Sequence, residues 1–388
     1  MPDTATVSAR GARRWQQGHP WIYRSDLVES PREAPGAVLV HDPRARPLGW
    51  ALWSPASEIS LRLLDARADA VIDAAWWDST LRTAIARRSP LRDVASAYRL
   101  VHGEGDGCPS LVCDRYDRWL VVQFMSAGLE RFRAEIVDAL VAITGAEGVL
   151  ARNDVSLRAK EQLPVTVELL RGDVPRVVEA YEHGVRYLAA PWEGQKTGAF
   201  LDQRENRARV GAIARGRALD CFSYHGSFAL HLARGADDVV ALDSSSAALE
   251  RARANVELNS LRNVHLVEAN AFDRLRELER ARERFDTIVL DPPAFAKTRA
   301  SLSGALRGYK EINLRAMRLL SPGGMLFTAS CSYHLTRPLF LEMLQRAAAD
   351  CGRPVALREL TAQPLDHPEV LTIPETGYLK GALVEAMA

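Results

Sequence analysis

The chain has 388 residues and a formal net charge of +1, and 47% of its residues are hydrophobic while 26% are charged. This length exceeds one ordinary hydrophobic core, so we expect two or three globular domains. No apolar run approaches the roughly 20 residues of a membrane span and the start lacks the layout of a signal peptide, so we expect a cytoplasmic protein without a membrane partner. The cysteines show no paired CxxC spacing, which argues against disulfides and a metal site; they stand at positions 108, 113, 221, 331 and 351.

Residues 1–73 are predicted to form a small β-rich module. Proline and glycine interrupt its short apolar runs, and the run at 59–64 alternates with the period of two that is typical of a half-buried strand. Basic side chains and an aromatic one precede these runs, namely Arg10, Arg13, Arg14 and Trp21. Such a mixture can bind a phosphate backbone and stack on bases. The alternative, which this module taken alone favours, is an amphipathic helix with Trp21 in the core.

Residues 74–180 are predicted to form a second domain, of the α+β class. Helical patterns at 74–88 and 130–141 flank a hairpin at 111–124 whose turn falls near Asp117. Asp106 and Asp114 are interpreted as turn and strand-end residues rather than as catalytic acids.

Residues 181–388 show alternating strand and helix patterns. Strict alternation predicts an α/β fold with a doubly wound, largely parallel sheet. Seven strands with a late hairpin are the Rossmann-like architecture of adenosylmethionine-dependent methyltransferases. The strand patterns fall at 218–222, 239–243, 264–270, 285–291, 325–331, 355–360 and 378–385, and helices are predicted, for example, at 246–258 and 309–320.

The ends of the first three of these strands carry residues suited to a nucleoside cofactor. Gly226 allows close backbone approach and precedes a predicted helix start whose free amides can bind a carboxylate. Asp243 ends the second strand, where an acid can accept both ribose hydroxyls. Asn270 and Phe272 follow the third, placed to read the adenine edge and to pack on its ring. A single glycine in place of GxGxxG argues against a dinucleotide. Each feature alone could also be a helix cap or a core aromatic.

Two further strands predict the catalytic residues. The run 285–291 is apolar and β-branched and ends on Asp291, and the two prolines that follow cannot donate to a sheet. The run 324–331 delivers Cys331 between two serines. Ligands of open parallel sheets bind outside the carboxyl ends of the strands, so Asp291 and Cys331 are expected to face one crevice. A cysteine alone is more often a small buried hydrophobe, but the flanking Ser330 and Ser332 favour a nucleophile.

Over nearly its whole length the chain resembles the 23S ribosomal RNA 5-methylcytosine methyltransferases that carry an N-terminal PUA domain ahead of a class I methyltransferase domain. The most specific match is Gly194-Gln195-Lys196-Thr197-Gly198 through Asp202-Gln203-Arg204 together with Ser330-Cys331-Ser332. The Asp291-Pro292-Pro293 element is shared by many methyltransferases. The other matching segments are 18–23, 102–107, 112–116, 307–310 with Asn313, and 378–381.

The resemblance implies S-adenosyl-L-methionine as cofactor, ribosomal RNA as partner, and Cys331 as the nucleophile, with Asp291 assisting. Together with the strand-end pattern it assigns to the cofactor Lys196, Thr197, Phe200, Gln203, Asp220, Phe222, Ser223, Gly226, Asp243, Asn270, Ala271, Phe272, Asp291 and Pro292. RNA contacts are assigned to Arg10, Arg13, Arg14, Trp21, Lys297 and Tyr309. The family usually has an acid where this chain has Asn270, so a weaker cofactor affinity is expected. A homodimer is left open.

The reaction implied by the resemblance needs these residue types because carbon 5 of cytosine is a poor nucleophile. A thiolate that adds to carbon 6 turns the ring into an enamine, which can attack the sulfonium methyl group. A free thiol, with a pKa of about 8.5, is only a few per cent ionised at neutral pH, so the site must favour the thiolate. Two alternatives stay open. One is a purine methyltransferase that uses the Asp291 loop and no cysteine; the other is a non-enzymatic RNA-binding protein with a degenerate Rossmann domain.

Overall fold

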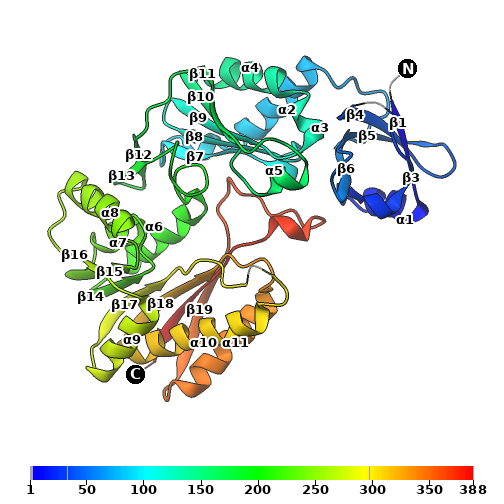
Figure 1. Ribbon diagram of the computed structural model, residues 1–388. Helices are drawn as coiled ribbons and strands as arrows, with labels where there is room; N and C mark the ends of the chain where they lie inside the picture. Colours follow the sequence, from blue (N-terminus) through cyan, green and yellow to red (C-terminus); the bar gives the residue numbers. More distant parts are fainter. Residues whose placement is uncertain (1–2, 33, 297, 388) are drawn as a thin grey trace. The chain divides into compact units, whose positions relative to one another are not determined.

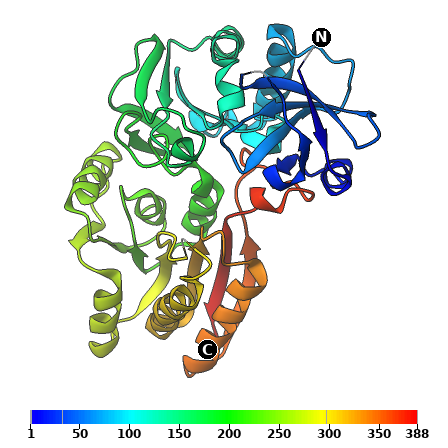
Figure 2. The ribbon, with the colours of Figure 1, turned by 45° about the vertical axis from the view of Figure 1, so that its right-hand side comes forward.

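The computed structural model describes residues 3–32, 34–296 and 298–387, and the chain divides into two compact units. Unit 1 comprises Met1–Glu182, Ala189–Leu201 and Leu365–Thr376, and unit 2 comprises His183–Leu188, Asp202–Pro364 and Gly377–Ala388. Figures 1 and 2 show the elements of both. The strands β12 (Val178–Glu182) and β13 (Val185–Ala189) form a two-stranded sheet of their own.

The N-terminal part of unit 1 is a six-stranded sheet in the order β2 (Trp21–Tyr23), β6 (Ile59–Asp65), β5 (Pro47–Trp53), β4 (Gly36–His41), β1 (Thr4–Val7) and β3 (Leu27–Glu29). Helix α1 (Ala9–Gln16) begins at Ser8, whose hydroxyl accepts the Gly11 N–H. Such a side-chain cap satisfies one of the free amides of a helix start. Arg62 on β6 is buried and pairs with the buried Glu161 at 2.8 Å, which ties this sheet to the rest of unit 1.

The rest of unit 1 is built on a five-stranded sheet in the order β11 (Val167–Gly172), β10 (Gly148–Arg152), β9 (Trp119–Phe124), β8 (Leu111–Tyr116) and β7 (Ala97–His102). Its helices are α2 (Ala74–Ala86), α3 (Ala127–Glu130), α4 (Arg133–Thr144) and α5 (Leu157–Lys160). Trp77 and Ile136, from α2 and α4, share one core with the sheet residues Leu100 and Val122. The predicted hairpin is β8–β9, with Asp117 in the left-handed conformation at its turn.

Unit 2 holds a seven-stranded sheet in the order β16 (Val264–Glu268), β15 (Asp238–Asp243), β14 (Arg217–Cys221), β17 (Phe285–Leu290), β18 (Leu320–Ser330), β20 (Lys380–Ala386) and β19 (Val355–Thr361). The strands from β16 to β18 are parallel, and β20 is antiparallel to both of its neighbours. This confirms the predicted doubly wound sheet with a late hairpin. The strand order reverses between β14 and β17, which is where open α/β sheets bind their ligands.

Helices cover both faces of this sheet (Figure 1). One face carries α6 (Arg204–Ile213), α7 (Ser227–Leu232) and α8 (Ser246–Leu258), and the other α9 (Ala271–Arg280), α10 (Leu302–Leu319) and α11 (Arg337–Asp350). Val289 of β17 belongs to the core of the first face, whereas its neighbours Ile288 and Leu290 belong to the core of the second. A strand buried on both faces reads as a continuous apolar run, which explains the sequence of β17. Helix α8 has its predicted bounds, and α10 begins at Leu302 rather than at 309.

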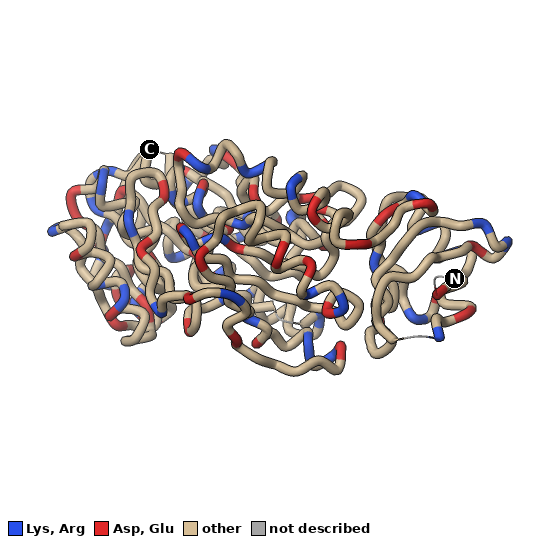
Figure 3. The backbone as a smooth tube through the Cα atoms, turned by 90° about the horizontal axis from the view of Figure 1, so that it is seen from above, with Lys and Arg blue, Asp and Glu red and all other residues tan. Residues whose placement is uncertain are grey.

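Basic and acidic residues are interspersed along the described chain, as the tube in Figure 3 shows, in keeping with a net charge of +1. No helix in the described part of the chain is long and apolar enough to cross a membrane. Within the same residues, no group of three or more His, Cys, Asp or Glu side chains is arranged to hold a metal ion.

Candidate cofactor and catalytic site

The carboxyl ends of the parallel strands in unit 2 meet at one edge of the sheet. Cys221 at the end of β14 is in register with Leu242 on β15 and with Leu290 on β17, and Leu290 is in register with Thr328 on β18. Four predicted site residues follow these positions along the edge, in the order Asp243, Phe222, Asp291 and Cys331.

Asp220 on β14 is a buried carboxylate with one oxygen unused. Its Oδ2 accepts the Ser223 hydroxyl at 2.7 Å and the Ala229 N–H at 3.0 Å, whereas Oδ1 has no hydrogen-bond partner. Burial raises the pKa of Asp220 to about 7, and the nearby carboxylates Asp291 and Asp243 add to the rise. A buried, partly satisfied carboxyl surrounded by further acids is an arrangement that a cationic ligand would stabilise.

The loop after β14 is bent toward Asp243 by residues in the left-handed conformation. Phe222, Tyr224 and Gly226 have φ angles of 65°, 51° and 84°. The bend lets the Tyr224 N–H donate to Asp243 Oδ2 at 2.9 Å, and the Ser245 N–H donates to Oδ1 at 2.9 Å. Each carboxylate oxygen keeps a second lone pair for a ribose hydroxyl. Strained backbone of this kind clusters at ligand sites.

Asn270 serves as a helix cap. Its Oδ1 accepts the N–H of Phe272 at 2.9 Å and that of Asp273 at 3.4 Å, so it begins α9, in which Ala271 is buried. The carbonyl oxygen that was expected to read the adenine edge is therefore engaged by the backbone. The Nδ2 group of Asn270 is the part of its side chain that can donate a hydrogen bond to a cofactor.

An aromatic cluster lies where the strand ends meet α10. The ring of Phe295 is 5.8 Å from Phe272, 6.4 Å from Phe222 and 4.6 Å from Tyr309, measured between centroids. The loop that carries Phe295 starts at Asp291 and the buried Pro292. Phe295 had no assigned role in the sequence analysis because its partners are distant in sequence.

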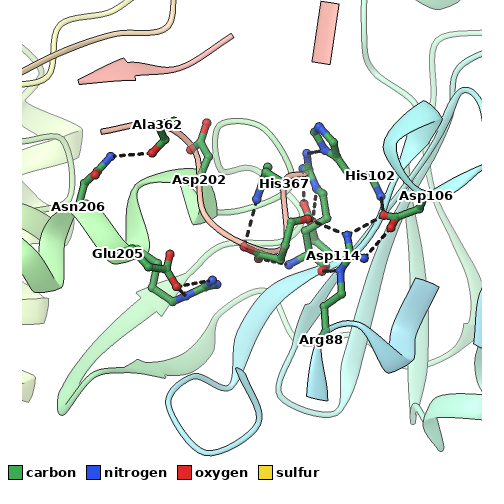
Figure 4. Close-up of polar contacts among 12 residues, drawn as sticks. Arg88, His102, Asp106, Asp114, Asp202, Glu205, Asn206, Ala362 and His367 are labelled. Carbon is green, nitrogen blue, oxygen red and sulfur yellow. Dashed lines mark hydrogen bonds and ion pairs between the residues drawn. The ribbon is translucent and has the colours of Figure 1, made fainter. Parts of the chain in front are cut away.

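Asp291 is held by a chain of amides from α6 and the turn before it. Its Oδ1 accepts Gln203 Nε2 at 2.8 Å, and Gln203 Oε1 accepts Asn206 Nδ2 at 2.6 Å. Asn206 also reaches the carbonyl of Ala362 (Figure 4). Gln203 thus stands beside Asp291, where its role is to orient the carboxylate.

Cys331 is the partly exposed cysteine of the chain, and the other four are buried. The serines on either side of it are fixed by the hydroxyl of Tyr309, which lies 2.9 Å from Ser330 Oγ and 2.9 Å from Ser332 Oγ. Tyr309 itself is only 1% exposed. This burial does not fit the predicted direct contact of Tyr309 with RNA, because the ring is enclosed by the core; its observed contacts hold the segment that carries Cys331.

The segment 196–200 belongs to unit 1. Lys196 is exposed, with its Nζ 4.7 Å from the centre of the Phe200 ring. Thr197 is 1% exposed and its hydroxyl donates to Asp114 Oδ2 at 2.5 Å. The Tyr116 hydroxyl accepts the Ala199 N–H at 3.0 Å. Thr197 therefore anchors this segment through β8, with its hydroxyl engaged by Asp114.

Asp106 ends the 3-10 turn η3 (Gly103–Asp106), as predicted for a turn residue, whereas Asp114 lies within β8 rather than at its end. Both are buried and paired with arginine (Figure 4). Arg88 donates to both oxygens of Asp106 at 2.6 Å, and Arg99 donates to both oxygens of Asp114 at 2.7 and 2.9 Å. These pairs left no local signal in the sequence, because Arg88 and Asp106 are 18 residues apart.

The residues assigned to RNA differ in their contacts. Arg10 and Arg14 pair with the buried Asp26, and the Trp21 indole N–H donates to Glu104 at 2.9 Å. Arg13 is exposed. Burial acts to raise the pKa of Asp26, but its hydrogen bonds, chiefly to Arg10, lower it overall, so the pair offsets part of the positive charge. Lys297 lies outside the described residues.

Comparison with known proteins agrees with this fold. The S-adenosylmethionine-dependent methyltransferase family matches residues 98–375, and the PUA-like domain family matches residues 5–66. A Streptococcus mutans structure described as a SAM-dependent methyltransferase superimposes with a TM-score of 0.83 at 20% identity, covering 99% of this chain and 100% of that one. A methyltransferase complexed with SAH gives 0.85 at 20% identity with the same coverage. The fold and the strand-end site thus define an adenosylmethionine-dependent methyltransferase.

Curated relatives narrow this class. The ribosomal RNA large subunit methyltransferase I of Erwinia tasmaniensis is 40% identical over 372 residues, which is 94% of each chain. The protein of the same name from Tolumonas auensis is 41% identical over 379 residues, 95% of this chain and 96% of that one. The chain belongs to the ribosomal RNA large subunit methyltransferase I family.

The residues at the strand ends fit S-adenosylmethionine. Asp220 Oδ1 has no hydrogen-bond partner, and the carboxyls of Asp291 and Asp243 both act electrostatically on Asp220. A ligand with a cationic sulfonium and an ammonium group offsets this concentration of negative charge.

Cofactor affinity is expected to depend on Asp220 ionisation. A cationic ligand favours the carboxylate, so binding releases a proton from a group whose pKa is about 7, and affinity falls as the pH drops below that value. Between pH 8 and pH 6 the loss attributable to this group should be about tenfold. Calorimetry on the parent and on Asp220→Asn measures this loss of affinity. The amino group of the ligand titrates in both experiments, so the ratio of the two dissociation constants isolates the contribution of the Asp220 carboxyl. A ratio that is constant with pH would contradict the assignment.

Proposed function

We propose that this protein transfers a methyl group from S-adenosylmethionine to carbon 5 of a cytosine in large-subunit ribosomal RNA. The observation that carries the proposal is the position of Cys331, a partly exposed thiol that follows β18 at the edge of the sheet where Asp220, Asp243 and Asp291 gather. The names of the relatives support large-subunit ribosomal RNA as the substrate. The cysteine supports cytosine as the methylated base and carbon 5 as the methylated atom.

The reaction follows from the chemistry of the ring. The Cys331 thiolate forms a bond to carbon 6, and the ring electrons move to make carbon 5 nucleophilic. S-adenosylmethionine supplies an electrophilic methyl group on its sulfonium. After carbon 5 is methylated, a base removes its proton, and the electrons of that bond restore the ring and expel the thiolate. Asp291, oriented by Gln203, is assigned in its protonated form to donate a hydrogen bond to the ring nitrogen and so to stabilise the negative charge that develops there.

The other roles divide between binding and support. The cofactor is assigned to the loop after β14, to Asp243 and to the start of α9, all of which lie in unit 2. Residues 1–73 are assigned to RNA, 74–180 to a middle domain and 181–388 to the chemistry. The match to a PUA-like domain and the exposed Arg13 support the RNA assignment. A base inside a duplex would have to be turned out to reach Cys331.

RNA with 5-fluorocytosine at the target tests the proposal. Fluorine cannot leave as a proton, so the thioether cannot be eliminated, and the protein incubated with this RNA and S-adenosylmethionine is expected to give a covalent band that survives denaturation. Cys221→Ser is the matched control, because Cys221 is fully buried in the core and should leave the band in place. The target itself is found by mapping 5-methylcytosine in ribosomal RNA from cells that lack the protein. Methylated RNA without a covalent band would instead support amino methylation through the Asp291 loop.

A further inference from the structure

Lys380 is a buried amine beside the segment that carries Cys331. It is the first residue of β20, in register with Ser330 of the antiparallel β18, and is 4% exposed. Its Nζ donates to the carbonyl of Ser332 at 2.7 Å and to the carbonyl of Tyr378 at 2.7 Å. The amine is therefore anchored to the backbone of the residue that follows Cys331.

No carboxylate among the described residues lies within ion-pair distance of Lys380. Two carbonyl dipoles satisfy two of its three N–H groups, but they do not neutralise its charge. A buried ammonium without a counter-ion is costly. The anion with which it interacts electrostatically is the thiolate of Cys331.

We propose that Lys380 is a positioning residue whose ammonium keeps the Cys331 thiol ionised before the thiolate adds to the base. The same ammonium stabilises the thiolate when the thiolate is expelled at the end of the reaction. This inference rests on the proposed function, in which Cys331 is the nucleophile. Lys380 touches neither the base nor the cofactor in this scheme and acts through Cys331. An opposite charge within about 4–6 Å lowers the pKa of an acid by one to three units.

The surroundings of this pair set its pH range. Burial lowers the pKa of Lys380 to about 8, the Cys331 thiolate opposes this effect, and the positive charge of Arg337 on α11 adds to it. The Tyr309 hydroxyl on α10 hydrogen-bonds the two serines that flank Cys331, and burial raises its pKa, so it remains neutral near pH 7. Lys380 is thus positively charged below about pH 8 and loses its effect on the thiol above that pH.

The pH dependence of alkylation by iodoacetamide tests the proposal in the free protein, without cofactor or RNA. The Cys331 peptide is followed by mass spectrometry, and Cys331→Ser gives the background from the four buried cysteines. The parent thiol is expected to titrate below about 8.5. Lys380→Met should raise that pKa by about one unit or more, and so slow alkylation at pH 7 about tenfold. Lys380→Arg keeps the charge and should retain most of the parent rate.

The outcomes separate the possible roles of Lys380. An unchanged thiol pKa in Lys380→Met, with S-adenosylmethionine affinity also unchanged, would overturn the proposal and leave Lys380 as a tie between two carbonyls. If Lys380→Met does not fold, the thiol pKa of the parent protein is the test, because a Cys331 pKa at or above about 8.5 also overturns the proposal. Failure of the proposed function looks different: Cys331→Ser would methylate RNA at near the parent rate whatever the thiol pKa.

Discussion

Cys331→Ser is expected to reduce RNA methylation at least about a thousandfold, because removal of a covalent nucleophile eliminates the reaction path that it opens. A serine hydroxyl is far less ionised and less nucleophilic than a thiol near neutral pH. Transfer of a radiolabelled methyl group to ribosomal RNA measures the loss. Affinity for S-adenosylmethionine should be nearly unchanged, since Cys331 has no part in holding the cofactor in the proposed site.

Cys351→Ser is the matched control for this variant. Cys351 is buried after α11, and its thiol donates to the carbonyl of Arg353 at 3.1 Å, a contact that a serine hydroxyl can also make. The control should methylate at close to the parent rate. Methylation by Cys331→Ser at a similar rate would exclude covalent catalysis and turn attention to the Asp291 loop.

Arg88→Met is expected to destabilise unit 1 by about 3–5 kcal/mol, because it leaves the buried Asp106 carboxylate without its principal partner. The Arg88 side chain is 2% exposed and also donates to the carbonyl of Asp366 at 2.9 Å. Asp366 Oδ2 in turn accepts the Arg99 N–H at 2.8 Å, so the loss extends to the segment Leu365–Thr376. Urea unfolding followed by tryptophan fluorescence reports on unit 1, since all eight tryptophans of the chain lie in it.

Arg118→Met provides the comparison on the surface of the same unit. Arg118 pairs with Glu147 at 2.7 Å, but the two side chains are 59% and 50% exposed. Water screens such a pair, so no measurable change in the urea midpoint is expected. Equal effects of the two substitutions would show that the Arg88–Asp106 pair contributes no more than a surface contact.

Local patterns in the amino-acid sequence were sufficient to predict the α/β class and the placement of the strand-end residues. Apolar β-branched runs, the prolines after Asp291 and the helix pattern at 246–258 are local signals, and β17 and α8 form where those signals occur. Because parallel strands expose their carboxyl ends at one edge, local pattern was enough to place Asp220, Asp243 and Asp291 together. The family resemblance added Cys331 as the nucleophile.

Which of the predicted side chains are already engaged by other residues became apparent from the folded structure. Thr197 looked like a cofactor contact, but Asp114, 83 residues away, engages its hydroxyl. Tyr309 looked like an RNA contact, but its side chain is buried and points from α10 to the end of β18, where its hydroxyl bonds Ser330. Lys380 lies beside the segment that carries Cys331, with its amine on the Ser332 carbonyl, because β20 inserts antiparallel to β18. Pairings between distant segments depend on the strand order and on the side chains that pack between them, which a periodic pattern along one segment does not encode.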